Sequence, residues 1–125
     1  MLDRRELAMA AMGLAIGGCA APPATGARPM FGMIGKMTAT AGQRDALIAI
    51  LLEGTTAMPG CLSYIVAKDS KDADAIWITE VWDSKDSHAA SLSLPAVKAA
   101  IAKGRPMIAG FGDGATTEPV GGAGL

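Results

Sequence analysis

The segment Ala75–Trp82 (AIWITEVW) constrains the fold more than any other part of the sequence. Its branched and aromatic residues are typical of a β-strand, in which successive side chains point to opposite faces. One face carries Ile76, Ile78, Glu80 and Trp82, and the other carries Ala75, Trp77, Thr79 and Val81. A half-exposed antiparallel strand alternates apolar and polar residues, whereas both faces of this strand are largely apolar. We therefore expect both faces to be covered.

Two different layers can cover such a strand. Helices of the same chain cover one face of an antiparallel sheet and leave the other face bare. A second copy of the same sheet is the simplest cover for the bare face, and this packing produces a dimer with twofold symmetry. The sequence therefore predicts a homodimer.

The residues around this strand predict an α+β domain. Cys61–Lys68 (CLSYIVAK) is a second strand, and a short polar turn joins it to Ala75–Trp82 in an antiparallel hairpin. The other predicted elements are a strand at Met30–Thr38, a helix at Gln43–Met58, a helix from Asp83 or Ser84 to about Ser93, a helix at Pro95–Lys103 and a strand at Phe111–Val120. The order is β-α-β-β-α-α-β. With the two short helices counted as one crossover, this is the ferredoxin-like plan, an antiparallel sheet with helices on one face.

Residues 1–19 have the features of an export signal. Arg4 and Arg5 precede a short apolar stretch, and small residues follow it. The paired arginines resemble the twin-arginine export signal, and Cys19, which follows Ile-Gly-Gly, resembles the acylated cysteine of a bacterial lipobox. We expect an exported protein, either periplasmic or attached to a membrane through a lipidated Cys19. Ordinary cleavage after Ala21 and a buried N-terminal helix are the alternatives.

The rest of the chain divides into a tether, one domain and a tail. Residues 20–29 are rich in Pro, Ala and Gly and predict a flexible tether. The domain occupies residues 30–120, a length suited to a single hydrophobic core. Residues 121–125 (GGAGL) predict a flexible tail.

The composition excludes several kinds of site. The formal net charge is −1 with no long block of one sign, whereas a nucleic-acid surface requires clustered Lys and Arg. The chain contains one histidine, which excludes a metal site built from several histidines of one chain. No Gly-rich phosphate loop and no nucleophile elbow occur in the sequence. We expect neither a nucleic-acid partner nor a metal ion.

Four short motifs, in order and with their spacing, resemble the antibiotic-biosynthesis monooxygenase family, in particular its quinol monooxygenases. They are Met58–Tyr64 (MPGCLSY), Glu80–Ser84 (EVWDS), His88–Leu92 (HAASL) and Pro95–Lys98 (PAVK). The resemblance covers about residues 30–120. It implies a dimeric α/β barrel, in which two ferredoxin-like units pack sheet to sheet and each holds a pocket between its sheet and its helices. It also implies oxidation of phenolic or quinol substrates by O₂ without metal, flavin or other cofactor.

Other branches of the same superfamily fit the sequence less well. The haem-degrading branch uses an Asn, a Trp and a His, and this chain contains no Asn. Trp82 matches the Trp of that branch, but Leu92 stands where that branch carries its His. Haem degradation is therefore not expected. Anthrone-oxidising relatives also use an Asn near their Trp, so their mechanism cannot be transferred to this chain.

Five residues are candidates for the site, and each has a structural alternative. His88 and Glu80 are the candidate catalytic bases, because histidine exchanges protons near neutral pH and a carboxylate on an apolar face can accept a proton. Otherwise His88 is an ordinary helix residue and Glu80 belongs to an ion pair. Trp82, Tyr64 and Met33 are the candidate substrate-binding residues: Trp82 walls the pocket or belongs to the core, Tyr64 donates to a substrate oxygen or packs, and Met33 lines the pocket or fills the core.

Two functions follow from these candidates. The first is a cofactor-independent monooxygenase that oxidises a small phenolic or quinol substrate with O₂, using the protein for a dry pocket, a base and orientation. The second is a non-enzymatic, exported, dimeric binder of small apolar or aromatic ligands. The sequence does not separate the two.

Overall fold

The computed structural model describes residues 29–125. The predicted signal peptide at residues 1–19, Cys19 and the tether before Pro29 lie outside the described residues. Within residues 29–125, none of the helices is long and apolar enough to cross a membrane.

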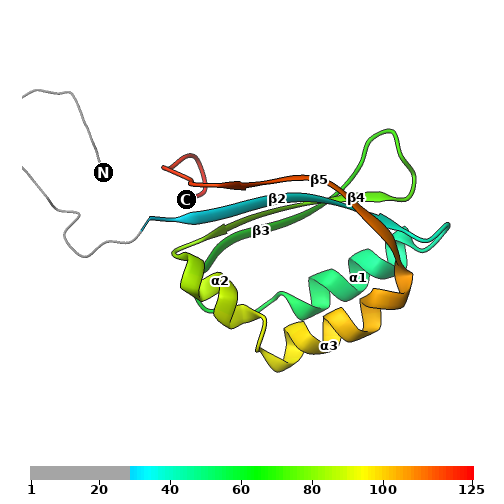
Figure 1. The fold of residues 1–125 in the computed structure, drawn as a ribbon, viewed down its shortest axis with the longest axis horizontal. Coiled ribbons are helices and arrows are strands. Elements are labelled where there is room, and N and C mark those ends of the chain that lie inside the picture. Colours follow the sequence, from blue (N-terminus) through cyan, green and yellow to red (C-terminus); the bar gives the residue numbers. More distant parts are fainter. Residues whose placement is uncertain (1–28) are drawn as a thin grey trace, which may run out of the picture.

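The described residues form one four-stranded sheet with helices on one side (Figure 1). In chain order the elements are β2 (Phe31–Ala39), α1 (Arg44–Gly54), β3 (Cys61–Lys68), β4 (Ala75–Trp82), α2 (Lys85–Ser91), α3 (Pro95–Gly104), the short 3₁₀ helix η1 (Arg105–Met107) and β5 (Ile108–Thr117). The strand order is β3-β4-β2-β5, and every pairing is antiparallel. This confirms the predicted ferredoxin-like α+β fold.

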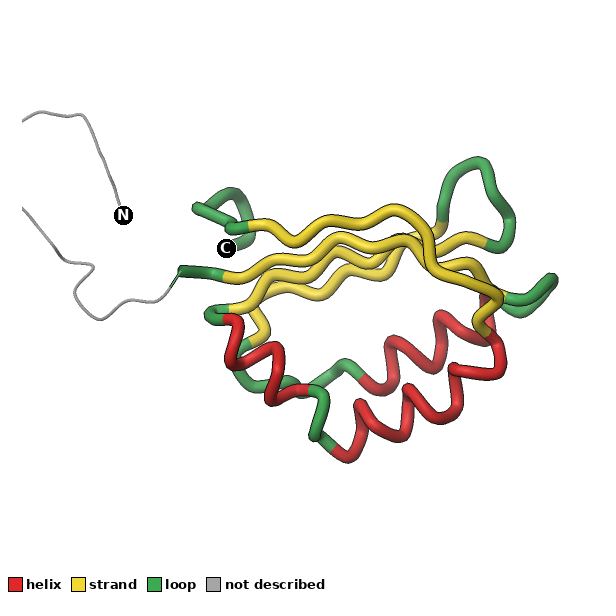
Figure 2. The backbone as a smooth tube through the Cα atoms, in the orientation of Figure 1, coloured by secondary structure: helices red, strands yellow, loops and turns green. Residues whose placement is uncertain are grey.

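The helices cover a single face of the sheet, and no helix of residues 29–125 lies on the opposite face (Figure 2). Ile76, Ile78 and Trp82 of β4 are buried on the helix-covered face, where Ile76 and Ile78 pack with Leu47 of α1 in the main core. The uncovered face is also apolar: Ile34 is 39% exposed and Ile65 is 54% exposed, and the pairing register places both beside Thr79. The two-faced apolar pattern of β4 therefore corresponds to one internal core and one bare face.

Two predicted elements, the first helix and the last strand, have boundaries that differ by several residues from the structure. The first helix ends at Gly54 instead of Met58. Gly54 is buried against Ala100 of α3, where a Cβ atom would collide with that side chain, and the Thr55 hydroxyl donates to the Leu51 carbonyl at 2.7 Å. Close packing of two helices therefore ends α1 one turn early.

The last strand begins at Ile108 instead of Phe111, and it ends at Thr117 instead of Val120. Ile108 already pairs with Ala39 of β2, so the ladder begins directly after η1. Pro119 lacks an N–H group and cannot extend the ladder. The strand therefore lies three residues earlier than predicted.

The loop between β3 and β4 is held by one carboxylate. Asp69 accepts hydrogen bonds from the backbone N–H groups of Lys71 and Asp72, both at 2.8 Å, and from the indole N–H of Trp77, also at 2.8 Å. The bonds from Asp72, Trp77 and Lys71 favour the ionised form and hold the pKa of the Asp69 carboxyl well below its usual range.

Replacing Asp69 by Asn is expected to lower the free energy of unfolding at neutral pH, because the amide lacks the charge that strengthens these bonds. Since the pKa is lowered by folding, the stabilisation is present above about pH 4 and is lost as the pH falls further. Urea unfolding at neutral pH and at about pH 2 should therefore show a difference between the two proteins that narrows in acid. Asp45→Asn, which changes an exposed ion pair with Lys68, is the control and should have little effect at either pH. If the wild type and Asp69→Asn differed in free energy of unfolding by the same amount at both pH values, this account would be contradicted.

Candidate functional site

A cavity of about 570 Å³ lies between the helix-covered face of the sheet and the three α-helices. Most of its lining is apolar, with side chains such as Met37, Leu51, Ile78 and Ile101. The polar lining includes Tyr64, Glu80 and His88, together with Trp82, which carries an indole N–H. Four of the five candidate site residues therefore line one cavity.

Strand geometry brings three of these four residues together. Glu80 and Trp82 lie two positions apart on β4, so both side chains point to the helix-covered face. Tyr64 of β3 is the register partner of Glu80 on the neighbouring strand. The phenol and the carboxylate are therefore side by side on one wall of the cavity.

His88 comes from α2, and two features fix that helix against the sheet. The Ser84 hydroxyl caps the helix by accepting a hydrogen bond from the Ser87 N–H at 3.1 Å. Gly60, with φ at +84°, lies so close to α2 that a Cβ atom there would be 2.5 Å from the Ser87 Cβ. As a result the His88 ring packs against Phe31 at 5.1 Å and edge-on to Trp82 at 5.5 Å between ring centres.

Glu80 and His88 form a polar pair in the cavity lining. Oε1 of Glu80 accepts a hydrogen bond from the Trp82 indole N–H at 2.9 Å and lies 3.9 Å from Nε2 of His88. Both side chains are largely shielded from water, with exposed fractions of 16% for Glu80 and 21% for His88. Trp82 is 1% exposed, so it belongs to the core and walls the cavity at the same time. The arrangement can accept a proton from a ligand in the cavity and hold it beside a second proton carrier.

Tyr64 and Cys61 remain protonated beside this carboxylate. Burial, and secondly the negative charge of Glu80, raises the pKa of the Tyr64 hydroxyl above its usual range. Burial likewise raises the pKa of the Cys61 thiol, which lies at the start of β3 and is partly exposed. Tyr64 can therefore serve as a hydrogen-bond donor to a ligand oxygen.

Met33 is the candidate that the structure does not bring to the cavity. It lies on β2 as the register partner of Glu80, but Met37, four residues later, contributes to the lining instead. The cavity also contains Ser91, Arg105 and Phe111, which sequence reasoning did not select. Ser91 lies within the His88–Leu92 motif, whereas Arg105 and Phe111 lie outside all four motifs, so only the three-dimensional structure identifies these two. Within residues 29–125, no group of three or more His, Cys, Asp or Glu side chains is arranged to hold a metal ion.

Comparison with known proteins identifies the family of this chain. The profile of the family described as antibiotic biosynthesis monooxygenase matches residues 30–103. The crystal structure of a candidate antibiotic biosynthesis monooxygenase from Chloroflexus aurantiacus J-10-fl has 70% sequence identity and a TM-score of 0.73, and the match covers 74% of this chain and 95% of that one. None of the curated proteins compared with this chain matches it.

More distant structures share the fold. A candidate antibiotic biosynthesis monooxygenase from Caulobacter crescentus CB15 has 19% identity and a TM-score of 0.68, with 76% of this chain and 93% of that chain covered. A protein from Nitrosomonas europaea with the same description has 11% identity and a TM-score of 0.68, with 74% and 92% covered. At these identities the likeness concerns the architecture alone.

Proposed function

The chain belongs to the antibiotic biosynthesis monooxygenase family, and from this premise we propose that it oxidises a small phenolic or quinol substrate with O₂, without metal or flavin. One observation carries the proposal. A carboxylate, Glu80, is oriented by the Trp82 indole and lies beside His88 inside a mostly apolar cavity. A phenol that enters such a cavity meets a proton acceptor in surroundings that otherwise favour its aromatic ring.

The reaction begins with transfer of the phenolic proton to Glu80 or His88. The resulting anion is electron-rich and gives its electrons to O₂, so that one oxygen atom becomes bonded to a ring carbon. Loss of the second oxygen atom as water leaves a quinone, or a hydroxyquinone when the substrate is a hydroquinone. Each turnover consumes one O₂ and releases one water, and no external reductant is required. The chain contributes the base, the orientation of the ring and the exclusion of bulk water.

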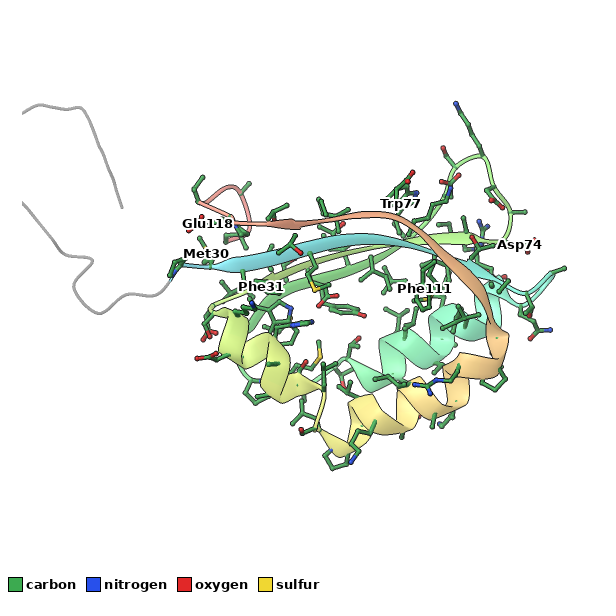
Figure 3. All side chains as sticks on the ribbon, in the orientation of Figure 1. Met30, Phe31, Asp74, Trp77, Phe111 and Glu118 are labelled. Carbon is green, nitrogen blue, oxygen red and sulfur yellow. The ribbon has the colours of Figure 1, made fainter. Side chains whose placement is uncertain are left out.

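We also propose that the protein acts as a homodimer through the bare face of its sheet. Trp77 lies on this face, opposite the helix side that holds Phe31 and Phe111 (Figure 3). Ile34 and Ile65 on the same face are partly exposed. The solvent-facing side of an antiparallel sheet usually carries polar side chains instead. A second sheet packed on this face would bury them, as the family resemblance implies.

Oxygen uptake tests the proposed activity. Metal-free protein is mixed with a panel of hydroquinones and anthrones, and O₂ consumption is followed with an electrode in the presence of a chelator. We expect uptake above the rate of spontaneous oxidation for at least one compound. A protein that binds these compounds tightly and never consumes O₂ would instead be a non-enzymatic binder of aromatic ligands.

A further inference from the structure

The cavity is elongated along β2, and its two ends differ in chemistry. In the pairing register of the sheet, Glu80 of β4 lies opposite Met33 of β2, and Phe111 of β5 lies opposite Met37 of β2. Four residues of strand separate these positions, a span of about 13 Å at roughly 3.3 Å per residue. The labelled Phe31 and Phe111 accordingly lie under opposite ends of the sheet (Figure 3). A ligand that fills the cavity is therefore longer than a single aromatic ring.

Charged side chains occur only at the two ends of the described lining. Glu80 and His88 mark one end, and among the lining residues of the range 29–125 the one other charged residue is Arg105. Arg105 begins η1, directly after α3, and Ile108 three residues later pairs with Ala39 at the last position of β2. The cation therefore belongs to the end of the cavity that is remote from Glu80.

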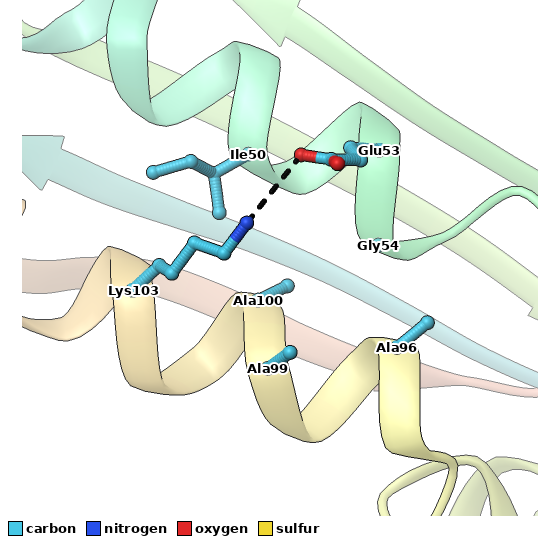
Figure 4. Close-up of a pocket in the computed structure, with 7 residues that line it drawn as sticks. All are labelled: Ile50, Glu53, Gly54, Ala96, Ala99, Ala100 and Lys103. Atoms are coloured by element: carbon cyan, nitrogen blue, oxygen red, sulfur yellow. Dashed lines mark ion pairs between the residues drawn. The ribbon is translucent and has the colours of Figure 1, made fainter.

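Arg105 differs from neighbouring cations in having no partner within residues 29–125. Arg44 donates from Nη1 to the carbonyl oxygen of Asp72 at 2.9 Å. Lys103 of α3 lies 3.7 Å from the Glu53 carboxylate in a separate crevice between α1 and α3 (Figure 4). The Arg105 guanidinium makes no hydrogen bond or ion pair with any residue of the range 29–125, and Arg105 is an exposed residue of the cavity lining. A guanidinium in this position is free to bind an anion.

The end of the cavity at Arg105 is otherwise apolar and open to solvent. Phe111 is 75% exposed and Ile101 is 40% exposed, yet both line the cavity. A ligand with an apolar middle segment would cover these side chains on its way to Arg105.

We propose that Arg105 binds the carboxylate of an elongated substrate, in which an apolar chain joins a phenolic ring to a terminal acid. The ring lies at Glu80 and Tyr64, the chain passes Ile78 and Ile101, and the carboxylate pairs with the guanidinium. The position of the ring rests on the proposed function; the anion site rests on Arg105 and the shape of the cavity. The substrate class is therefore an aromatic alkanoic acid.

Binding of matched probes tests this inference. A hydroquinone that carries a heptanoic acid chain and its primary amide are titrated calorimetrically into the full chain under nitrogen, so that no oxidation occurs. The acid should bind the wild type about tenfold more tightly than the amide, a difference of about 1.4 kcal/mol, because only the carboxylate forms an ion pair with the guanidinium. Arg105→Gln should remove this preference and leave binding of the amide unchanged. A short probe, dihydroxybenzoic acid against its amide, should show no preference that depends on Arg105.

Lys103→Gln is the matched control, because it removes a cation of the same helix end that lies outside the cavity. It should keep the preference for the acid. The inference is overturned if the wild type shows no preference, if Arg105→Gln keeps it, or if Lys103→Gln loses it equally. Oxygen uptake is measured separately. An Arg105-dependent preference for the acid without O₂ uptake would support the anion site and refute the proposed oxidation. Oxygen uptake without a preference for the acid would support the proposed oxidation and refute the anion site.

Discussion

The His88→Ala variant is expected to oxidise its quinol substrate at least about a hundredfold more slowly than the wild type at neutral pH, since a positioned general base typically contributes about 10²–10⁴ in rate. His88 lies 3.9 Å from Glu80 and packs edge-on against Trp82, so the change removes a proton carrier from beside the carboxylate. Steady-state O₂ uptake measures the effect, and urea unfolding checks that the fold is retained.

Glu80→Gln separates the two candidate bases. The amide oxygen can still accept the Trp82 N–H hydrogen bond, while the capacity to take a proton is lost. If His88→Ala stays active and Glu80→Gln does not, the carboxylate is the base. Lys85→Ala, an exposed residue of the same helix as His88, is the control and should leave the rate unchanged. Full activity in both site variants would show that the site assignment is wrong.

The second large effect concerns the bare face of the sheet. Thr79→Asp is expected to convert a dimer into a monomer at micromolar concentration and to lower stability. Thr79 lies between Ile34 and Ile65 in the pairing register, so a carboxylate there would be buried without a partner in a sheet-to-sheet dimer. An unpaired buried charge costs several kcal/mol.

Light scattering measures the mass of the full chain and of the variant. Ala49→Asp, on the exposed side of α1, adds the same charge on the other side of the molecule and should leave the dimer intact. A wild type that is monomeric, or a Thr79→Asp protein that still has twice the monomer mass, would refute packing through this face.

The two strands of the β3–β4 hairpin could be predicted because local chemistry specifies them. Cys61–Lys68 and Ala75–Trp82 have the predicted bounds, since strand-forming residues end at polar turns. The ends of α1 and β5 could not be predicted in the same way. Gly54 ends a helix through its contact with α3, and Ile108 begins a strand through its pairing with β2, so both boundaries depend on tertiary structure.

The candidate site was predictable where it depends on strand periodicity. The shared face of Glu80 and Trp82 follows from their spacing of two residues. The approach of His88 to Glu80 depends on how closely α2 packs against Gly60. This is a tertiary contact, and the periodicity of the sequence does not predict it. Strand periodicity also cannot distinguish Met33 from Met37, because both lie on the same face of β2. Arg105 reaches the cavity through the 3₁₀ turn after α3, where sequence reasoning predicted no element.

Mass spectrometry of the product formed under isotopically labelled O₂ tests the central claim most directly. The claim is that this cavity carries out a monooxygenation in which Glu80 and His88 take the phenolic proton. With metal-free wild type, we predict a quinone that contains one labelled oxygen atom, one labelled water for each O₂ consumed, and loss of both in the Glu80→Gln, His88→Ala double variant. A product without label, release of hydrogen peroxide in place of water, or equal labelling by the double variant would contradict the account.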